Sequence, residues 1–286
     1  MNKRTVVLLS ATWMLLTLIF SSAAVGVQSR NAQLLITLSG FDDQLAILPD
    51  AVNSSFNTLM LVDGVVAPFE TNDIPQLKSA VSSVFKSQTL RDSVLNELEA
   101  SLSEDEMATL IQFFSSKAGT SLRRSELENS VLEHADRFHQ WYQETGMYGL
   151  DHVRQRAIHD LERAMQATLG AVDAMIGMQV AMQVSLSPVL PANERLSPSE
   201  LLLVAQEQRP ELTRVYRQSS LETLAFVFQE QSTDAISAYA AVLKTNAGQR
   251  YVTALNEGMT RGLFSAAEQL GMSIQEILKG RLGQGA

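Results

Sequence analysis

The sequence predicts an all-α protein, and two observations carry this prediction. Hydrophobic residues make up 45% of the 286 residues, whereas the chain holds only 15 Gly and 7 Pro. It can therefore bury a large core and is poor in turn-forming residues. Apolar residues also recur at helical spacing along most of the chain, as in Met107, Leu110, Ile111 and Phe114.

A helix followed by a bend occurs twice in the sequence. Residues 102–122 read LSEDEMATLIQFFSSKAGTSL, and residues 231–251 read QSTDAISAYAAVLKTNAGQRY. An ungapped alignment pairs Ser103 with Ser232, Phe114 with Leu243, Ser116 with Thr245, and Gly119 with Gly248. The two segments are separated by about half of the chain. They predict two tandem pseudo-repeated helical bundles, packed around a long central helix.

The first copy of the motif contains clear helix signals. Ser103 and Glu106 form a capping box, which predicts a helix start. Phe113 and Phe114 then widen the apolar stripe of that helix, so one face of it must be buried.

Gly119 and its counterpart Gly248 follow runs of small residues after an apolar helix. A new apolar periodicity begins after each of them. We therefore expect each glycine just past a helix end, in the left-handed conformation that glycine adopts without strain.

The acidic helix start, the Phe113-Phe114 pair and the Ser116 to Gly119 segment resemble a bacterial family designated domain of unknown function 2059. Residues 34–49, LLITLSGFDDQLAILP, resemble the leading segment of that family. The resemblance implies a secreted, all-helical protein with two degenerate copies of the motif. It brings no catalytic residues, because the family has no assigned activity.

The first 24 residues have the layout of a secretory signal peptide. Lys3 and Arg4 precede an uncharged apolar run at 6–20, and small residues follow at 21–24. The alternative is an uncleaved anchor, because residues 5–27 carry no charge and about 20 residues can span a bilayer. The expected location is periplasmic or secreted.

The remaining chain divides into two units at a proline-containing linker. Residues 25–186 form the first helical unit, and its long helix is expected at 151–186. Residues 187–196 form the linker. Residues 197–286 form the second unit, which begins at the capping box Ser197-Pro198-Ser199-Glu200. Near the start of the first unit, we expect Pro49 to end a helix that begins close to Leu34.

Charge and composition exclude several classes of function. The net charge of −9 disfavours nucleic acid and anionic membranes as partners, and the absence of cysteine excludes disulfides and thiol chemistry. The four histidines, at 134, 139, 152 and 159, lack metal-ligand spacing. No catalytic, nucleotide or cofactor motif occurs, so we expect no enzyme activity, no cofactor and no metal.

Two groups of residues are candidates for lining a ligand site. Phe138, Trp141 and Tyr142 form an aromatic stripe that fits either a groove or internal packing, and packing is favoured. Met175, Met178 and Met182 lie at helical spacing in the apolar run 169–186. They fit either a core or a cavity for an apolar ligand. Asp173 within this run disfavours a membrane span.

These features favour a non-enzymatic periplasmic interaction or scaffold protein, whose partner is an envelope protein. One alternative is a carrier of an apolar small molecule in a cavity lined by the three methionines. Another is an envelope hydrolase with an unrecognised pair of carboxylates.

Overall fold

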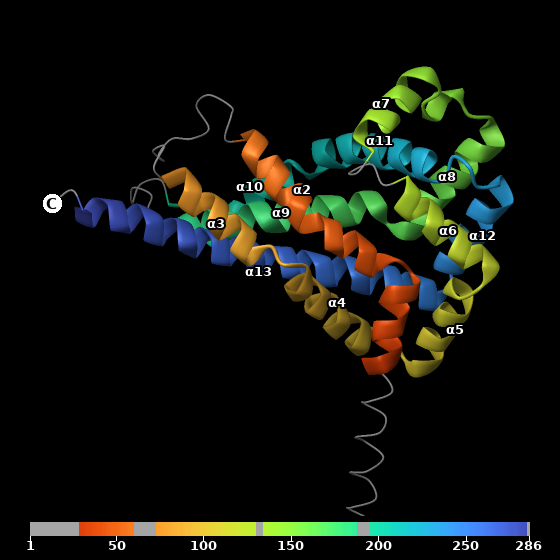
Figure 1. Ribbon diagram of the computed structural model, residues 1–286, viewed down its shortest axis with the longest axis horizontal. Coiled ribbons are helices and arrows are strands. Elements are labelled where there is room, and N and C mark those ends of the chain that lie inside the picture. Colours follow the sequence, from red (N-terminus) through yellow and green to blue (C-terminus); the bar gives the residue numbers. More distant parts are fainter. Residues whose placement is uncertain (1–28, 60–72, 130–133, 188–194, 285–286) are drawn as a thin grey trace, which may run out of the picture.

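A computed structural model describes residues 29–59, 73–129, 134–187 and 195–284 (Figure 1). Over these ranges the regular structure is entirely helical, which confirms the all-α class. Residues 29–38 are helical and precede the labelled helices. These are α2 (Phe41–Leu59), α3 (Ile74–Val84), α4 (Ser87–Ser101), α5 (Glu104–Phe114), α6 (Lys117–Glu128), α7 (Ala135–Glu144), the 3₁₀ turn η2 (Met147–Gly149), α8 (His152–Met165), α9 (Ala167–Leu186), α10 (Pro198–Glu207), α11 (Arg209–Val227), α12 (Thr233–Leu243) and α13 (Asn246–Gln284). None of these helices has the combined length and apolar character that crossing a bilayer requires.

Helix α13 is the longest helix in the described part of the chain. It spans 39 residues, extends along most of the fold and packs along α9, α4 and α3 (Figure 1). A Cβ added at Gly258 would lie 2.6 Å from the Cα atom of Val94. The backbones of α13 and α4 therefore touch, and only glycine permits this approach.

The long helix expected at 151–186 is instead two helices. Gln166 adopts a left-handed conformation, with φ of 50° and ψ of 30°, between α8 and α9. The buried Glu162 carboxylate accepts hydrogen bonds from Thr168, at 2.5 Å from Oγ1 and 3.4 Å from the backbone nitrogen. The helix can end and restart here because Glu162 accepts a hydrogen bond from a backbone N–H group in the first turn of α9, where such groups have no acceptor within the helix. The longest helix, α13, lies in the other half of the sequence.

The two halves of the sequence are packed into each other. Helix α12 lies on α8, α11 lies on α8 and α9, and α13 lies on α9 and α4. Arg154 of α8 donates to the carbonyl oxygens of Phe228 (2.6 Å), Gln229 (3.0 Å) and Gln231 (2.8 Å), just beyond α11. The described residues of the segments 25–186 and 197–286 thus share three hydrophobic clusters, each built from both segments, and do not form separate bundles.

Some of the expected helix boundaries agree with the structure and others do not. Both capping boxes are confirmed, at Ser103 with Glu106 and at Ser197 with Glu200. The prediction that Pro49 ends a helix is wrong, because α2 continues through Pro49 to Leu59. The break lies earlier, at Gly40, where φ is +80°. The signal segment 1–24 and linker residues 188–194 lie outside the described ranges.

The two copies of the motif form the same corner. Helices α5 and α12 each span 11 residues, and each is followed by a sharp bend into α6 or α13. At the first bend the Ser116 hydroxyl accepts from the Gly119 nitrogen at 3.2 Å. At the second, the Thr245 hydroxyl accepts from the Gly248 nitrogen at 3.1 Å. The likeness is local, because α6 ends at residue 128 whereas α13 continues to residue 284.

The expected left-handed conformation of Gly119 and Gly248 is wrong. Neither has a positive φ, and each lies in the first turn of the second helix of its corner. Glycine fits here for a different reason. A Cβ would lie 2.4 Å from the Phe113 carbonyl oxygen at Gly119, and 2.3 Å from the Val242 carbonyl oxygen at Gly248. The second helix of each corner can therefore approach the end of the first only through a glycine.

Candidate functional site

The aromatic stripe of α7 contributes mainly to packing. Phe138 and Trp141 are half-buried and contact the fully buried Phe226 of α11, with ring centroids 5.4 and 5.7 Å apart. Tyr142 is 50% exposed and lies beside Phe138. Through Phe138 and Trp141 the stripe attaches α7 to α11.

Three cavities in the described part of the fold, of about 500, 370 and 170 Å³, are not lined by Met175 or Met178 of α9. Met178 packs against the apolar cluster formed by α3 and the end of α13, which includes Leu77 and Leu270. Met175 is half-buried, and the side chain of Met182 lies outside the described part of the structure. A cavity elsewhere in the fold is a stronger candidate for an apolar ligand.

That cavity surrounds Glu126. Two adjoining cavities, of about 370 and 170 Å³, share the lining residues Phe41, Gln44, Glu126 and Met165. Their remaining lining comes from α2, α9, α11, α12 and α13, and it is mostly apolar: Leu45, Ile47, Leu48, Ala167, Thr223, Leu224, Val227, Phe228, Tyr239, Leu243, Tyr251, Val252, Leu255, Asn256 and Met259. Together with α8, which contributes Met165, six helices from both halves of the chain thus surround the carboxyl group that α6 carries.

The motif corners build one wall of this site. Phe113 and Phe114 of α5 pack on Tyr239 of α12, with ring centroids 5.8 and 6.2 Å apart. Phe114 also contacts Tyr251 of α13 at 5.7 Å. Because Tyr239 and Tyr251 line the smaller cavity, this aromatic cluster fixes its shape.

Glu126 has no hydrogen-bond or ion-pair partner in the described part of the chain. Arg123, one turn earlier on α6, would be its natural partner. However, the Arg123 Nη2 atom lies 2.8 Å from Asp43 Oδ2, and Arg123 packs over Gly40. The guanidinium is held by α2, and Glu126 is left facing the cavities.

This environment changes the protonation of Glu126. Burial raises the pKa of its carboxyl from 4.5 to about 8, and the charge of Arg123 only partly opposes the rise. Its side chain keeps intermediate solvent accessibility, because the cavities adjoin it. A carboxyl group that is unpaired, desolvated and set in a cavity is typical of a functional site.

The two tyrosines respond to the same environment. Burial raises the pKa of Tyr239 and of Tyr251 above the usual value, and a negative charge on Glu126 raises both further. Their hydroxyl groups therefore stay protonated and can act as hydrogen-bond donors at neutral pH.

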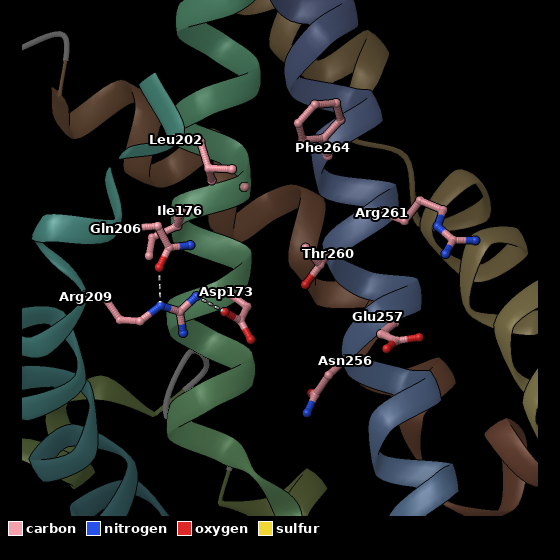
Figure 2. Close-up of a pocket in the computed structure, with 11 residues that line it drawn as sticks. Asp173, Ile176, Leu202, Gln206, Arg209, Asn256, Glu257, Thr260, Arg261 and Phe264 are labelled. Carbon is pink, nitrogen blue, oxygen red and sulfur yellow. Dashed lines mark hydrogen bonds and ion pairs between the residues drawn. The ribbon is translucent and has the colours of Figure 1, made fainter. Parts of the chain in front are cut away.

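A third cavity, of about 500 Å³, lies between α9, α10 and α13 (Figure 2). Arg209 forms an ion pair with Asp173, and its Nε atom donates to Gln206 at 2.6 Å. On α13, Asn256 and Thr260 point toward α9, whereas Arg261 points away and pairs with Glu97 of α4 (Figure 2). Both arginines are already neutralised, so this cavity is a weaker candidate than the one around Glu126.

Metal and carboxylate chemistry find little support in the described residues. No cluster of three or more His, Asp or Glu side chains is placed to hold a metal ion there. Among the residues that line the two Glu126 cavities, Glu126 carries the single carboxyl group. A hydrolytic pair of carboxylates would need a second one.

Known proteins provide no further guide to this site. No family model, curated protein or solved structure matches the chain. The resemblance to the domain of unknown function 2059 family stays a prediction.

Sequence reasoning missed Glu126, although a signal was present. Helix α6 is rich in charged residues and reads as a solvated surface helix. Yet Glu126 follows Leu122 by four positions and Gly119 by seven, and both of those residues are buried. The helical periodicity thus places this carboxylate on the buried face of α6.

Proposed function

We propose that this protein is a non-enzymatic binding protein, whose cavity around Glu126 takes a small molecule with an apolar body. The observation that carries the proposal is the unpaired Glu126 carboxyl in mostly apolar surroundings. Small-molecule sites typically combine an apolar lining with a few polar groups that orient the ligand. The volume of about 370 Å³ falls within the usual range of such sites, roughly 300–1,000 Å³. We propose in addition that the chain is exported, as the segment 1–24 predicts.

Binding of a neutral apolar dye, N-phenyl-1-naphthylamine, tests this function by fluorescence. Met165 lines both cavities, and a Met165→Trp variant fills space in them. Met272, which is 54% exposed on α13, provides a matched Met272→Trp control. We expect saturable binding by the wild type and the control, and weakened binding by Met165→Trp. Equal binding by all three proteins would place the dye elsewhere and contradict the proposal.

The scaffold hypothesis is a second candidate, and one observation favours it. Helix α10 exposes three consecutive apolar side chains, Leu202, Leu203 and Val204, at 47%, 64% and 45%. Exposed apolar side chains of this size can bind a protein partner. Native mass spectrometry of the protein purified from its own cells separates the two functions. A bound small molecule supports the carrier, and a bound envelope protein that a Leu203→Asp variant loses supports the scaffold.

A further inference from the structure

The Glu126 cavities also indicate the chemical class of their ligand, provided that they bind one as proposed above. We infer that the ligand is a cationic amphiphile, with an apolar tail and an amine or quaternary ammonium head that pairs with Glu126. The inference rests on the charges, the aromatic rings and the shape of the two cavities.

The charge around the cavities favours a cation. Glu126 is the one residue of their lining whose side chain can carry a full charge near neutral pH, because no Lys, Arg or His lines them. Arg123, one turn before Glu126 on α6, is bound to Asp43 on α2. The Glu126 carboxyl is partly buried and has no partner among the described residues, so a ligand cation would supply an ion pair that the protein does not provide.

The uncharged groups near Glu126 are also suited to a cationic head. Phe41, Tyr239 and Tyr251 present aromatic rings in the smaller cavity, and ring faces attract ammonium groups. Gln44 lines both cavities and offers an amide oxygen as an acceptor. An anionic head would find no positive charge in the lining of either cavity.

The shape of the site separates a place for the head from a place for the tail. The smaller cavity holds the two tyrosines, whereas the larger is lined by aliphatic residues such as Leu45, Leu224 and Val227. Glu126 lies where the two meet. A head group beside Glu126 therefore leaves the larger cavity for an alkyl chain.

Isothermal titration calorimetry with three probes tests the inference. Decyltrimethylammonium, 1-decanol and decanoate share one alkyl chain and differ in charge, and each is used below its micellar concentration. We expect the ammonium probe to bind most tightly to the wild type. Glu126→Gln should weaken its binding about 10- to 100-fold, because it removes the negative charge that attracts the ammonium group. Glu128→Gln, on an exposed position of the same helix, is the matched control and should bind like the wild type.

The pH dependence provides a second readout. The groups that bear on Glu126 are Arg123 on its own helix, Tyr239 on α12 and Tyr251 on α13. The two tyrosines stay neutral between pH 6 and 9, because burial raises the pKa of each. A quaternary ammonium needs the ionised form of Glu126, whose pKa is about 8 in the free protein. Its affinity should therefore fall by up to about tenfold per pH unit below pH 8.

The outcomes separate this inference from the proposed function. If all three probes bind alike and Glu126→Gln changes none of them, the cavity binds apolar chains and the cationic class is refuted. Preference for decanoate would also refute it and would indicate Arg123 as the partner of the head group. If no probe binds to the folded wild type, both the inference and the proposed apolar cavity site fail.

Discussion

Replacing either corner glycine with alanine should destabilise the protein, even though both glycines lie in helices. Alanine normally stabilises a helix relative to glycine by up to about 1 kcal/mol. At Gly119 the new Cβ would lie 2.4 Å from the Phe113 carbonyl oxygen and 2.7 Å from the Phe114 Cα atom. These are backbone atoms that cannot rotate away, so the two helices of the corner must separate. Overpacking of this kind costs about 1–3 kcal/mol, and we expect a net loss of about 2 kcal/mol.

Gly248→Ala should behave in the same way, because its Cβ would lie 2.3 Å from the Val242 carbonyl oxygen. Gly280 provides a matched control, since it lies in α13 with nothing within 4 Å of an added Cβ. Thermal melts should show a midpoint lowered by at least about 4 °C for each corner variant, at about 2 °C or more per kcal/mol. Gly280→Ala should leave the midpoint unchanged or raise it. Stabilisation of Gly119→Ala and Gly248→Ala would refute the close contact at the two corners.

Four further substitutions test the polar groups of the fold. The unfolding free energy of Glu126→Gln should rise relative to that of the wild type between pH 5 and pH 9. A folded-state pKa of about 8, raised from 4.5, means that the wild type loses stability as pH rises through this window. The full pKa shift would correspond to an upper limit of about 5 kcal/mol in unfolding free energy, and water in the cavities should reduce this to about 1–3 kcal/mol. Urea unfolding of both proteins at pH 5 and pH 9 measures the difference. An equal change in stability with pH for the variant and the wild type would contradict the prediction. Arg154→Gln should cost about 2–4 kcal/mol in urea unfolding, because it removes the charged donor to three carbonyl oxygens, whereas Arg156→Gln on an exposed position should cost little. Ser103→Ala and Ser232→Ala should each lower the stability by about 1 kcal/mol, and unchanged melting midpoints would show that these caps are dispensable.

The helices and their starts were predictable because they depend on local sequence. The capping box at Ser103 and Glu106 acts within one turn, and so does the one at Ser197 and Glu200. The position of the two corners was also predictable from the small residues before each glycine. Their mechanism was not, because the contact of Gly119 with Phe113 is set by how closely two helices meet.

The break at Gln166 could not be read from local sequence. Glutamine has no preference for the left-handed conformation, and the segment 151–186 is helical in character on both sides of it. Two side-chain hydrogen bonds stabilise the chain at this position. Thr168 donates to Glu162, and the Gln166 amide donates to Gln249 of α13 at 3.0 Å. The partner on α13 is 83 residues away in the chain.

The Glu126 site depends on tertiary structure in the same way. Periodicity places Glu126 on the buried face of α6, but it does not show that Asp43 on α2 holds Arg123 away. Nor does it show that the two motif corners bring Tyr239 and Tyr251 to the same cavity. The methionines of α9 appeared more suitable for an apolar ligand because they cluster in sequence, and Met178 is used for packing instead.

The central claim is that Glu126 is an unpaired carboxyl in an apolar cavity, and its titration tests this most directly. The side-chain carboxyl carbon of Glu126 can be followed by ¹³C NMR from pH 4 to 10 in the free protein, with Glu126→Gln to assign the resonance. The structure predicts a midpoint of about 8, caused by burial. It also predicts that decyltrimethylammonium lowers this midpoint. A midpoint near 4.5 in the free protein would show a solvated or paired carboxylate and would contradict the account.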